Sequence, residues 1–238
     1  MAGQERRLLL PDAIQEKLAV RMYEQGHFGI KENPDDYTTL KSGRRSPHYF
    51  DLRTGLSDPH TRRGVADAMV ELALAKTHSV NVGQLRDHYA YFVGSPEAMT
   101  SYGASIADLA FMPLLQPRVN TSKTTGNKSP ILGRYHEGDE VAAFDDVITD
   151  GATKIETIQT LGAHGLVVAD YFVVLDREEG GAVEVQSGTG LSVVPALGLA
   201  QTVKILRANS LATQTQFDNV VEYMNQYGDP HAISELAA

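Results

Sequence analysis

One stretch of the sequence combines residue types that can hold a phosphorylated sugar. Residues 141–156 read VAAFDDVITDGATKIE, so a short apolar run is followed by Asp145 and Asp146 and then by a turn that contains glycine. Adjacent carboxylates repel each other, and a nearby group must therefore use or solvate them. Sugar hydroxyls are suitable partners, and so is a magnesium ion shared with the phosphates of the same ligand.

The turn that follows has the composition of a phosphate-binding loop. If residues 141–144 form a buried strand, the acidic pair lies at its carboxyl end, where ligands of open α/β sheets bind. A helix is predicted to begin near Thr153. The N–H groups at its start, the hydroxyl of Thr149 and the close approach allowed by Gly151 would form a cradle for phosphate. Asp150 is unusual there, because its carboxylate repels a phosphate unless it points to solvent.

A simpler interpretation is that the acidic pair caps a helix or lies in a solvated turn. Short motifs often match by chance. The full order of strand, acidic pair, threonine, glycine, threonine and helix makes that interpretation less favourable, and we therefore predict a ligand site.

Composition restricts the class of protein. The chain has 238 residues, enough for one α/β domain of ordinary size, and no cysteine, which excludes disulfides, thiolate zinc sites and a cysteine nucleophile. Its net charge of −9, from 21 basic and 30 acidic residues, argues against nucleic acid as a partner. No apolar run approaches a membrane span and the N-terminus lacks the pattern of a secretory signal. We expect a cytoplasmic protein with no membrane partner.

Helix-like and strand-like patterns alternate along the chain. Apolar residues at helical spacing predict helices over 12–25, 61–76, 101–111, 153–161 and 212–226. Strands are predicted at 88–94, 112–115, 141–144, 166–176 and 191–197, with a hairpin over 37–52 and a polar loop over 116–140. This order predicts an α/β fold with a mostly parallel sheet covered by helices on both faces.

Three stretches together resemble the orotate phosphoribosyltransferases, which belong to the type I phosphoribosyltransferases. VAAFDDVITDGATK is similar to the phosphoribosyl pyrophosphate (PRPP) signature of the superfamily. LKSGRRSPHYFDLR, residues 40–53, resembles the N-terminal hairpin of the orotate enzymes, and VVLDREEGG, residues 173–181, resembles their later strand that ends in Asp-Arg. The resemblance implies the type I phosphoribosyltransferase fold. Residues 1–60 would form a hood of helix and hairpin over the base site, and residues 61–238 the PRPP-binding core.

The resemblance also implies roles for individual residues. The implied catalytic residues are Lys123, Asp145 and Asp146. The implied PRPP-binding residues are Lys41, Arg118, Lys123, Asp145, Asp146, Thr149, Gly151, Ala152 and Thr153. The implied orotate-binding residues are Lys41, Tyr49, Phe50, Thr149 and Arg177. The alternative for the aromatic pair is packing in the hairpin core, and for Arg177 it is a surface ion pair with Glu178 or Glu179.

The implied reaction is displacement of pyrophosphate from C1 of PRPP by N1 of orotate, which gives orotidine 5′-monophosphate in de novo pyrimidine biosynthesis. Mg²⁺ is the implied cofactor, held mainly by PRPP near Asp145 and Asp146. Catalysis would consist of positioning the two ligands and neutralising the departing pyrophosphate. The resemblance further implies a homodimer in which the loop over residues 116–140 reaches the neighbouring site.

The same loop departs from the family pattern. With the alignment anchored on Gly126, Lys123 falls on the family's second lysine, and Arg118 could replace the arginine after a shift of one residue. The positions of the family's arginine, first lysine and histidine hold Val119, Asn120 and Thr125. Ala98 takes a place where some members carry a lysine. Fewer cations would therefore meet the pyrophosphate.

Two other interpretations follow from these departures. The chain could be a regulatory homologue that binds PRPP and orotate with weak or no catalysis. It could also be a phosphoribosyltransferase for another base, although Lys41, Tyr49 and Arg177 favour a carboxylated pyrimidine.

Overall fold

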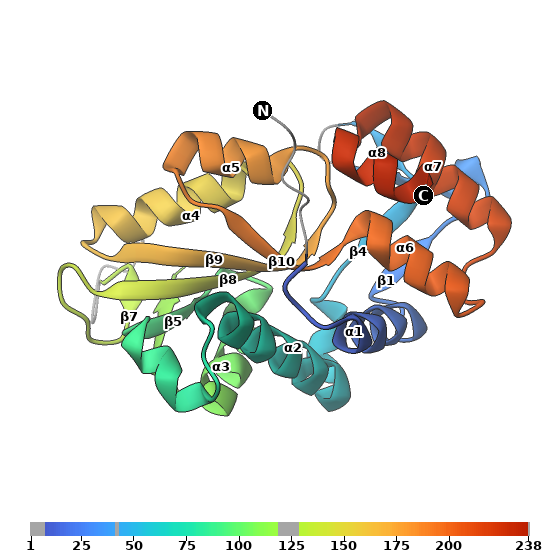
Figure 1. The fold of residues 1–238 in the computed structure, drawn as a ribbon. Coiled ribbons are helices and arrows are strands. Elements are labelled where there is room, and N and C mark those ends of the chain that lie inside the picture. The colour runs from blue at the N-terminus through green and yellow to red at the C-terminus, as the bar shows by residue number, and fades with distance from the viewer. Residues whose placement is uncertain (1–7, 41–42, 119–128, 238) are drawn as a thin grey trace.

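A six-stranded sheet forms the centre of the computed structural model, which describes residues 8–40, 43–118 and 129–237 (Figure 1). The strand order is β10-β9-β8-β5-β6-β7, and all neighbours are parallel except β7, which runs antiparallel to β6. The strands are β5 (Tyr91–Gly94), β6 (Leu114–Pro117), β7 (Ile131–Leu132), β8 (Glu140–Ile148), β9 (Val167–Asp176) and β10 (Val193–Gly198).

Helices cover both faces of this sheet, which confirms the predicted α/β class. In Figure 1, α4 and α5 lie on one face, α2 and α3 lie on the other, and α1 and α6 pack beside β10. The α-helices are α1 (Asp12–Glu24), α2 (Pro59–Thr77), α3 (Met99–Ala110), α4 (Ala152–Ala163), α5 (Gly181–Thr189), α6 (Leu199–Ala208), α7 (Gln214–Tyr227) and α8 (Pro230–Ala237). The 3-10 helices are η1 (Pro34–Asp36), η2 (Thr54–Ser57) and η3 (Val82–Asp87). Among these helices, none combines the length and apolar composition that crossing a membrane requires.

The central strand β8 is buried on both faces, as its apolar sequence requires. Ala142 and Phe144 pack in the core beneath α2 and α3, whereas Val141 and Ala143 pack in the second core beneath α4 and α5. The Phe144 ring stacks on Phe172 of β9 at 5.2 Å between centroids. Because successive side chains of a strand point to opposite faces, the two acidic residues that follow Phe144 also face different layers.

The N-terminal strands differ from the single hairpin predicted over 37–52. β2 (Thr38–Thr39) and β3 (Arg45–Ser46) do form an antiparallel hairpin. β4 (His48–Phe50) instead pairs with β1 (Phe28–Ile30), a strand that the sequence did not predict. Pro47 separates the two pairings because it has no N–H to donate, while its carbonyl accepts from Lys31 at 2.7 Å.

Other elements also differ from the prediction. β8 continues to Ile148 rather than ending at residue 144, so Asp145 and Asp146 lie inside the strand. Asp145 lies opposite Val173 in the β8–β9 ladder. Aspartate has low strand propensity, and the neighbouring ladder overrides it here. The sequence also missed α5, α6 and α8, of which α5 contains two glycines and α8 is only eight residues long.

Candidate active site

Asp145 is held inside the protein by partners on two other elements. Its side chain is buried, and Oδ2 lies 2.6 Å from Nζ of Lys154 in α4 and accepts a hydrogen bond from the Tyr171 hydroxyl of β9 at 3.1 Å. Oδ1 accepts from the N–H of Asp146 at 2.9 Å. Lys154 is itself only 6% exposed. A sugar hydroxyl would therefore have to compete with a buried ion pair for this carboxylate.

Asp146 lies on the opposite side of the strand and, among the described residues, has no buried ion pair like that between Asp145 and Lys154. Its Oδ1 accepts from the N–H of Val147 at 2.7 Å. Burial, and then the negative charge of Asp145, raise the pKa of Asp146 to about 6, against a smaller opposing effect of Lys154. A nearby cation, or hydroxyl groups that donate hydrogen bonds, would stabilise the ionised form of this carboxylate. The sequence treated the pair as equivalent, although strand alternation and the lysine at the start of α4 are signals that distinguish its members.

The turn between β8 and α4 matches the predicted phosphate cradle in its backbone. Gly151 precedes the first residue of α4 at φ +80 and has no side chain of its own to cap the helix. A Cβ at this position would come within 2.6 Å of the Gly181 carbonyl oxygen, so the close approach requires glycine. The Asp150 carboxylate is exposed and accepts the N–H of Ala152 at 3.1 Å. The Asp150 carboxylate thus occupies an N–H group at the helix start that we predicted from sequence to bind phosphate.

A second turn, between β5 and α3, lies beside the acidic pair. Gly94 has no space for a Cβ, which would overlap the Met99 carbonyl. Ser95 donates its N–H to Phe144 of β8 at 2.8 Å, and its hydroxyl lies 2.9 Å from that of Tyr171. A chain of polar contacts therefore runs from this turn through Tyr171 to Asp145 and α4. Ala98, at the family's lysine position, is buried.

The aromatic pair of β4 is divided between core and surface. Phe50 is buried, as the packing alternative predicted, whereas Tyr49 is 40% exposed. The Tyr49 hydroxyl donates to Asp51 at 3.2 Å, and Asp51 also pairs with Arg53 at 2.9 Å. Asp51 chiefly, and Asp146 to a smaller extent, raise the pKa of the Arg53 guanidinium. Neither Asp51 nor Arg53 was among the site residues predicted from sequence, although both belong to the segment over residues 40–53 that resembles the orotate enzymes.

Arg177 lies at the end of β9 in a buried ion-pair cluster. Its guanidinium is 2.7 Å from Oε1 of Glu179, whose Oε2 is 2.7 Å from the guanidinium of Arg44. Arg177 also donates to the Ser46 hydroxyl at 3.2 Å and to the Tyr223 hydroxyl at 3.4 Å. The Glu179 pair considered from sequence is therefore present, but it is buried instead of exposed. Two guanidinium groups therefore contact one carboxylate.

One buried donor of this cluster is open to another acceptor, and the neighbouring histidine adds no charge. Arg177 Nε is buried without a hydrogen-bond partner among the described residues. The ring of His48, edge-on to Tyr223 at 5.2 Å, is also buried. Burial, and then the charge of Arg177, lower the pKa of His48 well below its usual value, so the ring is neutral and adds no cation.

The phosphate turn and the Arg177 turn are packed backbone against backbone. A Cβ at Gly181 would overlap the Thr149 carbonyl, so glycine is required on this side of the contact too. The N–H of Arg177 donates to the Ile148 carbonyl at 3.1 Å. The two turns therefore keep a fixed relative position at the carboxyl ends of β8 and β9, where open α/β sheets bind ligands.

The chain can now be compared with known proteins. No protein-family model matches it. An orotate phosphoribosyltransferase of Caenorhabditis elegans is 34% identical over 141 residues, which are 59% of this chain and 58% of that protein. One of Cenarchaeum symbiosum is 33% identical over 141 residues, 59% of this chain and 66% of that protein. The chain is similar to orotate phosphoribosyltransferases over about three fifths of its length.

A solved structure extends the likeness to most of the chain. UMP synthase of Leishmania donovani is 27% identical, with a TM-score of 0.72 over 90% of this chain and 42% of that one. This likeness, together with the observed sheet order, confirms the type I phosphoribosyltransferase fold predicted for this chain. The chain spans less than two thirds of the length of these three relatives.

Several residues that the family resemblance singled out lie outside the described part of the chain. They are Lys41, Val119, Asn120, Lys123, Thr125 and Gly126. Arg118 is described, and its N–H donates to the Pro130 carbonyl at 2.8 Å beside the β6–β7 pair. The proposed roles of the residues outside the described part of the chain stay predictions.

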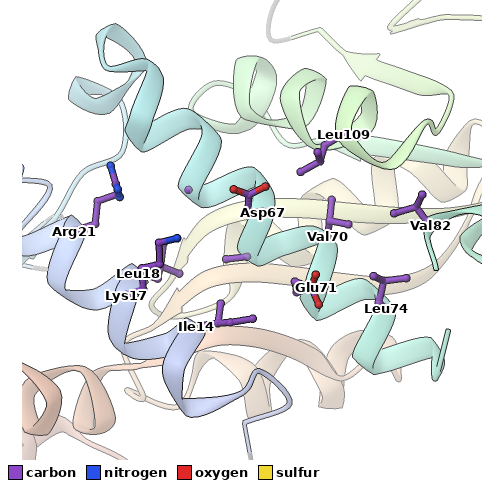
Figure 2. A pocket seen from close by; sticks show the side chains of 12 residues that line it. Ile14, Lys17, Leu18, Arg21, Asp67, Val70, Glu71, Leu74, Val82 and Leu109 are labelled. Carbon is purple, nitrogen blue, oxygen red and sulfur yellow. The ribbon is translucent and has the colours of Figure 1, made fainter. Parts of the chain in front are cut away.

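A cavity of about 400 Å³ between α1 and α2 is separate from the family's site (Figure 2). Lys17 and Arg21 of α1 line one side, and Asp67 and Glu71 of α2 line the other. Its lining contains none of the residues predicted to bind PRPP or orotate. We therefore place the candidate active site at the strand ends.

The two adjacent aspartates should respond in opposite directions to neutralisation. Asp145→Asn leaves Lys154 buried without its counter-charge, and we expect it to lower the free energy of unfolding by about 3–5 kcal/mol. The pKa of Asp146 is raised on folding, so the stability it contributes is complete below its unfolded pKa and is lost as the pH rises through about 6. Asp146→Asn should therefore stabilise the protein above this pH, by on the order of 1–2 kcal/mol.

Urea unfolding of both variants, at about pH 8 and about pH 4, measures the effect. The gain from Asp146→Asn should disappear at the lower pH, where wild-type Asp146 is protonated in the folded state. Equal destabilisation by both substitutions at the higher pH would show that the pair is equivalent.

Proposed function

We propose that the chain transfers the phosphoribosyl group of PRPP to N1 of orotate, with release of pyrophosphate and formation of orotidine 5′-monophosphate. The observation that carries the proposal is Asp146, a partly buried carboxylate of raised pKa beside a glycine turn that opens a helix. Similarity to relatives named orotate phosphoribosyltransferase and UMP synthase supports the same reaction. De novo pyrimidine biosynthesis is the proposed context.

PRPP would bind across the carboxyl end of β8. We assign the ribose hydroxyls to Asp146, with Asp145 fixing the strand end through Lys154. The 5′-phosphate would take the backbone N–H groups of residues 151–153 and the hydroxyls of Thr149 and Thr153. For this to happen, the Asp150 carboxylate has to leave the Ala152 N–H that it now accepts.

Mg²⁺ fits the charge of this site. The carboxylate oxygens of Asp146 are ligands of the type that Mg²⁺ uses, and burial beside Asp145 leaves that carboxylate short of positive charge. When bound with PRPP, the ion would neutralise charge on the departing pyrophosphate. The protein's own part is to keep Asp146 at the strand end and to fix the direction of the ribose.

Orotate would bind between the exposed ring of Tyr49 and the cluster around Arg177. Arg177 Nε, which is buried without a hydrogen-bond partner among the described residues, supports a site for the orotate carboxylate. Thr149 lies in the turn packed against the Arg177 turn, which supports its proposed contact with the base. Lys41 and Phe50 remain proposed contributors, Phe50 by packing behind Tyr49.

We further propose that the chain acts in the cytoplasm as a homodimer. The family resemblance supports this arrangement, in which Lys123 and Arg118 of the loop reach the pyrophosphate of the neighbouring site. No covalent nucleophile is needed, since the anomeric carbon develops oxocarbenium character and the protein orients and neutralises around it.

A direct assay tests the reaction. Purified protein supplied with Mg²⁺, PRPP and orotate should release pyrophosphate and consume orotate in equal amounts. Asp146→Asn should lower kcat/KM by about 100-fold, because it removes charge at the reacting sugar. If the wild type releases no pyrophosphate while calorimetry shows both ligands binding, the transferase proposal fails and a binding homologue replaces it.

Asp150 gives a second test that concerns PRPP alone. Asp150→Ser removes a carboxylate that competes for the Ala152 N–H, and one such hydrogen bond is worth about 1 kcal/mol, so KM for PRPP should fall by about fivefold. Asp87→Ser removes the same charge from an exposed position in η3 and should leave KM unchanged. An unchanged or higher KM in Asp150→Ser would mean that this carboxylate does not compete with phosphate.

A further inference from the structure

The turn after β9 presents side chains in two directions. Arg177 points into the cluster with Glu179, whereas the next residue, Glu178, contacts the C-terminal helices. Glu178 is held at φ +57 and is only 6% exposed. Its Oε2 accepts the N–H of Ala200 at the start of α6 at 2.8 Å, and its carbonyl accepts the N–H of Asp229, just before α8, at 2.7 Å. The turn is thus fastened to both helices.

The Glu178 carboxylate is buried without a compensating cation. Among the described residues, no lysine or arginine forms an ion pair with it, and the Ala200 N–H is its one hydrogen-bond donor. The charges that act on it come from Asp176, Glu235 and Asp229. A positive ion at Oε1 would remove the cost of burying this group.

Two further ligand side chains face Glu178 from α8. His231 and Glu235 are one helical turn apart and therefore share a face of the helix. His231 Nδ1 lies 3.9 Å from Glu235 Oε2, and one ligand atom from each of the three residues lies within 4.8 Å of the others. All three side chains line a cavity of about 1040 Å³, so an ion could enter and keep solvent ligands.

We propose that Glu178, His231 and Glu235 bind a divalent transition-metal ion, with Zn²⁺ as the best match. One imidazole and two carboxylates form a ligand set that Zn²⁺ accepts, whereas Mg²⁺ prefers oxygen alone. Two ligands at about 2.1 Å from a tetrahedral ion lie about 3.4 Å apart, whereas these ligand atoms lie within 4.8 Å of one another, so the three side chains need to close by at most about 1.4 Å. The cavity side is left for water. The bound ion ties α8 to the turn that carries Arg177.

Calorimetric titration of ZnCl₂ into the metal-free full chain tests the site. We expect one saturable ion per chain and a rise in Tm with added Zn²⁺ that a chelator reverses. His231→Ala and Glu235→Gln should each weaken binding by at least about 10-fold. Both positions are partly exposed, with 40% and 26% of the side chain accessible, so these variants should fold. The isosteric variant Glu178→Gln tests the third ligand in the same titration.

His136 supplies the matched control. Its Nδ1 lies 3.6 Å from Asp139, so it forms a comparable exposed histidine–carboxylate pair without a third ligand. His136→Ala should bind Zn²⁺ as the wild type does. Absence of saturable binding by the wild type overturns the proposal, and so does equal affinity in His231→Ala. The measurement is independent of PRPP and orotate, so its failure leaves the transferase proposal untouched.

Discussion

In the described part of the chain, two adjacent carboxylates at the end of β8 share only one buried cation, and the arrangement of the site follows from that shortage. Lys154 reaches Asp145 from the first turn of α4, and the hydroxyl of Tyr171 completes the contact from β9. Asp145 therefore joins strand, helix and neighbouring strand. Burial, and then the charge of Asp145, raise the pKa of Asp146, and we therefore assign the ligand to this member of the pair.

The two halves of the proposed site are positioned by one backbone contact. Thr149 and Gly151 of the phosphate turn meet Gly181 so closely that neither glycine position has space for a Cβ. The Arg177 N–H adds a hydrogen bond to the last residue of β8. Phosphate turn and base turn therefore belong to one rigid unit. The proposed metal site would fasten the outer side of the same unit to α8.

Much of this architecture could be predicted from sequence because it depends on local pattern. Apolar periodicity predicts the alternation of helices and strands, and Gly151 marks the position of the glycine turn. Partners across the chain were harder to predict. Nothing local shows that β4 leaves its hairpin to pair with β1, or that Glu179 lies between Arg44 and Arg177. The unequal roles of Asp145 and Asp146 follow from alternation once the strand is extended to Ile148.

The central claim is that Asp146 is the uncompensated member of the pair. Carbon-13 NMR of side-chain carboxyl groups, with Asp146 assigned through the Asp146→Asn variant, measures this directly. The account predicts a titration midpoint at about pH 6 in the ligand-free protein. It also predicts a lower midpoint when PRPP and Mg²⁺ are added, because both favour the charged form. A midpoint at the ordinary aspartate value of about 3.9 without ligand would contradict it.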